Sequence, residues 1–259
     1  MKIACVQQNH NTGKVEENRE KAIGFAKEAL GNEAEIILFH EELLIGYHKD
    51  MKELAEPADG VTTRAFAELL AGTDAKIVYG LTEIKDGRYY ISAPVVTVHG
   101  IAAIYRKTHL WWKASGLRDE TAVYTPGDSL TVFEHGGYKI GILICYDGDF
   151  PEMFRSYAKL GCSLVLWMNN RNSRGPDDCC IEAAVRNSLA VATSCACGAD
   201  ETGRHSQGLS NIVDCNGKVL SVIKDVEGVI YADLDLSKSL AARSENPWYR
   251  GMRPDLYIR

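Results

Sequence analysis

The chain has 259 residues, of which 46% are hydrophobic and 25% are charged, and both values are ordinary for a globular protein. This length fits one large α/β domain or two small ones, with enough chain to bury a sizeable core. The formal net charge of −6 argues against a general binder of nucleic acid or of anionic membranes, because both classes need a basic face.

The first half of the chain alternates between the patterns of strands and helices. A strand at residues 2–7 precedes a helix at 15–30, whose apolar side chains recur at helical spacing. The next expected elements are a buried strand at 35–39, a helix at 63–73, a strand at 76–84, and strands at 88–98 and 101–110 joined by a turn at His99-Gly100.

A loop-like segment at 111–129 separates this half from a second run of alternating elements. That run comprises strands at 130–134 and 139–145, a helix at 151–161, a strand at 163–168, a helix at 177–190, strands at 191–196, 209–214, 218–223 and 228–236, and an irregular tail from 246. No internal repeat or Pro/Ser-rich linker divides the chain. We therefore expect a single layered α/β domain over residues 1–259.

The amino-terminal segment reads as a short strand and a charged helix. It lacks the long apolar region of a signal peptide, and no stretch reaches the roughly 18 apolar residues of a membrane span. We therefore expect a cytoplasmic protein with reduced thiols. Neither Cys179-Cys180 nor Cys195-Ala196-Cys197 has the usual spacing of zinc ligands, so we expect no metal. A redox or metal-sensing role for Cys195 and Cys197 is the alternative.

Cys145 ends an apolar strand and is followed at once by Tyr-Asp-Gly-Asp-Phe-Pro-Glu. A cysteine at this place lies near the start of the next helix, where the helix dipole stabilises a thiolate. Asp149 and Glu152 have the spacing of a capping box, which supports a helix start there. A buried cysteine that closes a core strand explains its position equally well.

A nucleophilic thiol needs a base, and carboxylates are better candidates than histidines. Glu41 and Glu42 follow a very apolar strand, where partial burial raises a carboxylate pKa toward the range useful for proton transfer. Two solvated acids that open a loop are the simpler alternative. His109 follows another strand and is a weaker candidate for the base.

A third polar group follows the strand at 101–110. Arg106 and Lys107 alternate, so that one side chain points inward, and an inward lysine can stabilise negative charge on a reacting oxygen. Glu41, Lys107 and Cys145 thus come at the carboxyl ends of three strands. Ligands collect at that edge in open α/β sheets.

With these residues in place, the chain resembles the nitrilase, or carbon–nitrogen hydrolase, superfamily over nearly its whole length. The segments LFHEELLIGY, YRKTHL and CYDGDFPE resemble the family's glutamate, lysine and cysteine motifs, and TPGDSLTVFEHGGYKIGILIC and GMRPDLY resemble further family segments. The resemblance implies a four-layer αββα sandwich. It also implies a homodimer or higher homo-oligomer formed through a helical face, with the tail from about residue 240 at the interface.

The resemblance also implies roles for individual residues. Glu41 corresponds to the general base, Lys107 to the stabiliser of the tetrahedral intermediate, and Cys145 to the nucleophile. Glu120 matches the family's second glutamate, and the backbone N–H of Tyr146 completes the oxyanion hole. The implied chemistry needs no cofactor and proceeds through a thioester.

Two positions depart from the family pattern. His40 stands where proline is most common, and either it affects how Glu41 is held or it is a packed imidazole. Asp149 stands where omega-amidase-type members carry an arginine that meets a substrate carboxylate. The reversed charge predicts an enzyme that disfavours acidic substrates and accepts neutral or cationic ones, unless Asp149 only caps the helix.

The reaction expected first is hydrolysis of a small primary amide to an acid and ammonia. Hydrolysis of N-carbamoyl amines comes second because the paired arginines common after the cysteine in carbamoylases are missing, and nitrile hydrolysis comes third because Cys145 precedes Tyr rather than Trp. An inactive binding scaffold is the alternative from another class. The residues expected at the substrate are Tyr47, Trp112, Tyr146, Asp149, Trp167, Asn169, Asn170 and Arg171.

Overall fold

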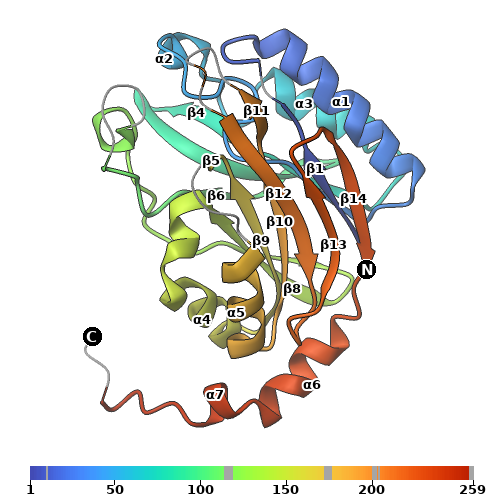
Figure 1. Ribbon diagram of the computed structural model, residues 1–259. Helices are drawn as coiled ribbons and strands as arrows, with labels where there is room; N and C mark the ends of the chain where they lie inside the picture. The colour runs from blue at the N-terminus through green and yellow to red at the C-terminus, as the bar shows by residue number, and fades with distance from the viewer. Residues whose placement is uncertain (10, 114–118, 172–176, 200–202, 204, 257–259) are drawn as a thin grey trace.

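Two seven-stranded β-sheets pack face to face, with helices on the outer side of each (Figure 1). The computed structural model describes residues 1–9, 11–113, 119–171, 177–199, 203 and 205–256. The order of layers is helices, sheet, sheet, helices. The four-layer αββα sandwich expected from the sequence is therefore confirmed.

The first sheet is built mainly from the amino-terminal half of the chain, with one strand from the end. Its order is β14-β1-β2-β3-β5-β4, and β6 pairs with β5. The bounds are β1 Lys2–Gln7, β2 Ile36–Leu38, β3 Lys76–Val78, β4 Leu81–Lys85, β5 Arg88–Thr97, β6 Gly100–Arg106 and β14 Gly228–Asp233. β1, β2 and β3 are parallel, and β14 is antiparallel to β1.

The second sheet has the order β11-β12-β10-β9-β8-β7, and β13 pairs with β12. Its strands are β7 Val132–His135, β8 Tyr138–Ile144, β9 Cys162–Asn169, β10 Ala190–Cys195, β11 Cys197–Ala199, β12 His205–Val213 and β13 Val219–Lys224. All eight residues of β9 are buried. Such a continuous buried run is typical of a parallel strand covered on both faces.

Helices α1 and α3 cover the first sheet, and α4 and α5 cover the second (Figure 1). The helices are α1 Val15–Gly31, α2 Met51–Leu54, α3 Val61–Leu69, α4 Pro151–Lys159, α5 Asp177–Asn187, α6 Ser237–Glu245 and α7 Pro247–Arg250. α1 buries Ala22, Ala26 and Ala29, which recur at helical spacing and have small side chains. None of the helices described here is long and apolar enough to cross a membrane.

Two expected elements differ in the structure. The strand expected at 76–84 is divided into β3 and β4 at Gly80, where a Cβ atom would lie 2.4 Å from the carbonyl oxygen of His40. The tail expected to be irregular from 246 contains α7, and α6 forms in the residues directly before it. The Arg243 guanidinium secures α6 by donating to the backbone carbonyls of Ala158, Cys162, Asn187 and Ser188.

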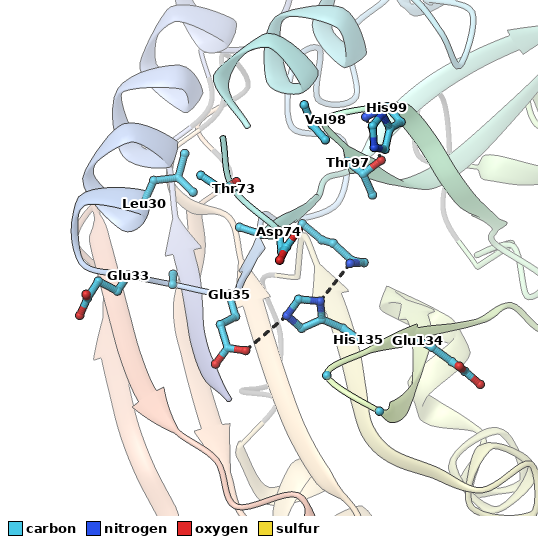
Figure 2. A pocket seen from close by; sticks show the side chains of 15 residues that line it. Leu30, Glu33, Glu35, Thr73, Asp74, Thr97, Val98, His99, Glu134 and His135 are labelled. Carbon is cyan, nitrogen blue, oxygen red and sulfur yellow. Dashed lines mark hydrogen bonds and ion pairs between the residues drawn. The ribbon is translucent and has the colours of Figure 1, made fainter. Parts of the chain in front are cut away.

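A cleft of about 730 Å³ lies at the end of β2 opposite Glu41 (Figure 2). There, His135 of the second sheet lies between two side chains of the first sheet. Its Nδ1 is 2.9 Å from Nζ of Lys76, and its Nε2 is 3.4 Å from Oε2 of Glu35. The Lys76 ammonium donates and the Glu35 carboxylate accepts, so the bridge needs a neutral imidazole protonated at Nε2.

This bridge makes stability depend on pH. Burial and the Lys76 ammonium lower the pKa of His135 below its ordinary value, so the unfolded chain binds this proton more readily. Stability should therefore be fully present above about pH 6.5 and fall as the pH decreases through the ordinary histidine range. We predict that wild type loses more unfolding free energy than His135→Gln between about pH 7.5 and 5.5 in urea titrations. Equal losses in both proteins would contradict a role for His135.

Candidate active site

Glu41 lies in the turn that follows β2, and its side chain is fully buried. Its Oε1 accepts a hydrogen bond from Nζ of Lys107 at 2.7 Å. Its Oε2 is buried with no hydrogen-bond partner in the described part of the chain. Glu42 is equally buried but accepts hydrogen bonds from the hydroxyls of Thr82 and Tyr124, so it belongs to a separate cluster.

Lys107 follows β6 directly and is 1% exposed. Its ammonium donates to two carboxylates, Oε1 of Glu41 at 2.7 Å and Oε1 of Glu120 at 2.8 Å. Glu120 is held in turn by the Tyr47 hydroxyl at 2.7 Å and by the backbone N–H of Trp111 at 2.8 Å. The structure thus brings Glu41, Lys107 and Glu120 into one buried ionic cluster.

Cys145 directly follows β8 and begins a 3₁₀ turn over Cys145–Asp149. Its φ of +47° lies in the left-handed region, which is strained for a residue with a side chain. Gly148 in this turn and Trp167 of β9 keep the turn close to β9. Gly148 packs on Trp167, where a Cβ atom would lie 2.3 Å from the indole ring, and Nε1 of Trp167 donates to the Cys145 carbonyl at 3.0 Å.

The pKa values of this cluster are set by burial and by mutual charge. Burial raises the pKa of Glu41, and the Lys107 ammonium only partly offsets that effect. Burial and the Glu41 carboxylate raise the pKa of the Cys145 thiol to about 12. Burial alone would lower the pKa of Lys107, but the two carboxylates raise it well above its ordinary range. At neutral pH the site therefore holds a thiol and an ammonium.

The predicted thiolate at a helix start is wrong for the resting site. α4 begins at Pro151, as expected, but its N-cap residue is Phe150 and makes no side-chain cap hydrogen bond, so the expected capping box of Asp149 and Glu152 does not form. The high thiol pKa follows from burial and from the Glu41 carboxylate. The alternative of solvated acids after β2 is also wrong, because Glu41 and Glu42 are both fully buried.

Asp147 is a site residue that the sequence reasoning missed. Its buried carboxylate accepts from the backbone N–H groups of Ile144, Thr108 and His109 and from the hydroxyls of Tyr105 and Thr108. In sequence, Thr108 and His109 directly follow Lys107, and Ile144 directly precedes Cys145. Asp147 therefore joins the two segments, and its place in CYDGDFPE, two residues after Cys145, was the available signal.

Aromatic side chains gather next to Cys145. Tyr146 makes edge contacts with Trp111 and Phe150, with ring centroids 5.0 Å apart in each case. The ring of His109 stacks on Phe150 at 4.1 Å, and its Nδ1 lies 3.0 Å from Oδ1 of Asp147. His109 is thereby placed against Asp147 and Phe150, and none of its contacts within the described ranges supports it as the base for Cys145.

The other residues expected at the substrate occupy different places. Trp112 is 62% exposed and Trp111 lies beside Tyr146 instead, whereas Trp167 is fully buried beneath the turn. The Tyr47 hydroxyl binds Glu120, and Asn170 accepts a hydrogen bond from Ser206. Asp149, Asn169 and Arg171 form a group of their own, in which the guanidinium binds both other side chains. Residues 172–176 of the expected pocket segment lie outside the described residues.

His40 and the cysteines Cys195 and Cys197 all lie in the interior of the protein. His40 is fully buried, and its Nδ1 lies 2.8 Å from the backbone carbonyl oxygen of Glu41. Cys195 and Cys197 are both buried. Among the residues that the structure describes, no three His, Cys, Asp or Glu side chains are grouped so as to hold a metal ion.

Comparison with known proteins yields consistent relatives. The carbon–nitrogen hydrolase family profile matches residues 2–244. An (R)-stereoselective amidase from a Pseudomonas species is 31% identical over 98% of this chain and 92% of that protein. The human omega-amidase is 30% identical over 93% of this chain and 91% of its own. In fold, the chain is similar to a carbon–nitrogen hydrolase superfamily protein from Xanthomonas campestris, with a TM-score of 0.88 and 21% identity over 100% and 98% of the two chains.

The Asp147 contacts lead to a prediction about stability. Asp147→Asn replaces an acceptor oxygen by an amide donor, which faces N–H groups and leaves them unpaired in the core. We predict a loss of about 1–3 kcal/mol in the free energy of unfolding, measured by urea titration. Asp59→Asn, at an exposed site, should change it by less than about 0.5 kcal/mol. A similar small effect for both variants would show that Asp147 does not hold the two segments together.

Proposed function

The chain belongs to the carbon–nitrogen hydrolase family, and from this premise we propose that it hydrolyses a small primary amide through a thioester on Cys145. The observation that carries the proposal is the buried cluster of Glu41, Lys107 and Glu120 next to this thiol. The two relatives whose names denote amidases support an amide as the substrate.

In the proposed first half-reaction, Glu41 acts as a general base. Its carboxylate takes the thiol proton as the sulfur of Cys145 attacks the amide carbonyl carbon. The resulting oxyanion is stabilised by the Lys107 ammonium and the Tyr146 N–H, each worth on the order of 3 kcal/mol. The C–N bond then breaks, the nitrogen receives the proton from Glu41 and leaves as ammonia, and the acyl group remains on sulfur.

In the second half-reaction, the same carboxylate activates water. Glu41 takes a proton from a water molecule, whose oxygen attacks the thioester carbonyl. The tetrahedral intermediate collapses with cleavage of the C–S bond, and the proton returns from Glu41 to the sulfur. The product is the carboxylic acid, and Cys145 is again a thiol. This sequence needs no oxidant, reductant or further reactant.

We propose a neutral acyl group for the substrate, which narrows the expectation from Asp149 that neutral or cationic substrates are accepted. Oδ1 of Asp149 lies 2.7 Å from Nη1 of Arg171, so its negative charge is countered within the protein. An ion pair presents neither an isolated anion nor an isolated cation to the ligand. The half-buried aromatic residues Trp111, Tyr146 and Phe150 next to Cys145 fit an uncharged acyl group better than a charged one.

The proposal predicts ammonia release from primary amides. We expect turnover of neutral amides by wild type and no turnover by Cys145→Ala. For Glu41→Gln we expect kcat to fall at least about 100-fold, because the base is lost. The measurement is an ammonia assay on neutral, cationic and acidic primary amides, with N-carbamoyl amines and nitriles alongside. Cys215→Ser, a buried cysteine outside the site, is the matched control and should retain activity.

The other outcomes of this assay discriminate among the alternatives. Turnover of N-carbamoyl amines alone would replace the amidase by a carbamoylase, and turnover of nitriles alone would make it a nitrilase. A preference for cationic amides would restore a substrate contact for Asp149. The absence of turnover with every compound would favour a binding scaffold.

The family resemblance implies a homodimer formed through a helical face. We further propose that this face is the one formed by α5 and α7. Trp248 is 52% exposed and borders a hollow of about 330 Å³ with Ile181 and Val185. Trp248→Glu should convert a dimer to a monomer in sedimentation velocity, because burying a carboxylate in an interface is costly. Val61→Glu, at an exposed site on α3, should remain a dimer. A monomeric wild type would refute the assembly.

A further inference from the structure

The carbonyl oxygen of Cys145 accepts two side-chain hydrogen bonds. Nε1 of Trp167 donates to it at 3.0 Å, and Nη2 of Arg171 donates at 2.5 Å. The second bond comes from a cation and is therefore the stronger of the two. The Arg171 guanidinium binds the backbone carbonyl of Cys145 and is not needed to hold the thiol in place. Its charge at this position therefore requires another explanation.

Three contacts keep the Arg171 guanidinium in one orientation. Its Nε donates to Oδ1 of Asn169 at 2.9 Å, its Nη1 donates to Oδ1 of Asp149 at 2.7 Å, and its plane lies over the ring of Trp167 with 5.0 Å to the centroid. The side chain is 14% exposed. A guanidinium that uses each of its nitrogens on the protein is arranged for a fixed position rather than for capture of a ligand.

The carbonyl in question belongs to the same peptide group as the N–H of Tyr146. No cis peptide bond occurs in the described chain, so this group is trans, and its C=O and N–H point in opposite directions. Fixing the carbonyl therefore fixes the direction of the N–H. A cation on the carbonyl also polarises the peptide and strengthens its N–H as a donor, by about 10–30% per bond.

We propose that Arg171 is a positioning residue for the oxyanion hole, which aims and polarises the Tyr146 N–H through the carbonyl of Cys145, and that Asp149 and Asn169 hold it there. This inference rests on the proposed function, since the N–H acts on the oxyanion of amide hydrolysis. It gives Asp149 a role inside the protein, in which its charge orients Arg171 and does not select the substrate.

The test separates oxyanion stabilisation from thiol reactivity. Alkylation by iodoacetamide forms an S–C bond at a saturated carbon and expels iodide, so it creates no oxyanion. Amide hydrolysis creates one. Arg171→Met keeps an apolar stem over Trp167 and removes the donor. We expect its kcat on a primary amide to fall about 30- to 100-fold, within the range for a weakened oxyanion donor, while KM and the rate of Cys145 alkylation each change less than about threefold.

Two further variants complete the design. Arg64 also donates to a backbone carbonyl, that of Asp59 at 2.7 Å, but lies exposed on α3, so Arg64→Met should keep wild-type kcat. Asp149→Asn keeps an acceptor for Arg171 and loses the charge, and its kcat should fall about 3- to 10-fold at unchanged KM. This variant carries the test if Arg171→Met does not fold, as judged by circular dichroism and thermal melting.

The remaining outcomes overturn the inference in different ways. Unchanged kcat in both variants would show that the peptide needs no cation. A rise in KM alone would make Arg171 a substrate ligand, and equal losses of alkylation and kcat would mean that it acts on the thiol. A wild type that turns over no amide would refute the proposed function and this inference together, whereas active wild type with an unaffected Arg171→Met would refute the inference alone.

Discussion

The whole site depends on one buried cation. Lys107 is 1% exposed, and an ammonium at such a place is tolerated only with opposite charges and hydrogen bonds around it. Glu41 and Glu120 supply both, at 2.7 and 2.8 Å. Because the two carboxylates come from loops after β2 and β6, the lysine holds these loops at a fixed separation. The removal of Lys107 would leave two buried carboxylates without a counter-charge.

The same cluster explains why both Glu41 and Cys145 have raised pKa values. Burial disfavours every anion in the site, and a carboxylate beside a thiolate would add repulsion. The site therefore accommodates one of these two negative charges at a time. A proton that moves from sulfur to Glu41 changes the location of the charge without increasing it. In the proposed mechanism this makes the base necessary, since a separate thiolate is not stable at rest.

The architecture and the main residues of the site could be read from the sequence, but their supports could not. Strand periodicity and the order of Glu41, Lys107 and Cys145 place three polar groups after three strands, and the structure brings them together with Glu120. The expectation of a single sheet edge was wrong, because β2 and β6 belong to the first sheet and β8 belongs to the second. Asp147 was missed because its function depends on donors that lie 38 to 42 residues away in sequence, such as Tyr105. Trp167 was expected at the substrate, yet an alternating strand turns it beneath the Cys145 turn. Such side-chain directions depend on the exact ends of strands, which periodicity locates only to within a few residues.

Asp149 illustrates a more general limit on arguments from charge. Its sequence neighbours suggested either a helix cap or an anion facing the substrate, and both readings treated the residue alone. In the folded chain its closest partner is Arg171, which follows the neighbouring strand β9 and is 22 residues away. The pair is electrically neutral as a unit, but it is not inert, because the guanidinium transmits its charge to the carbonyl of Cys145. A charged residue near a nucleophile can thus act on the backbone of the nucleophile rather than on the ligand. Only the position of its counter-ion distinguishes these two roles.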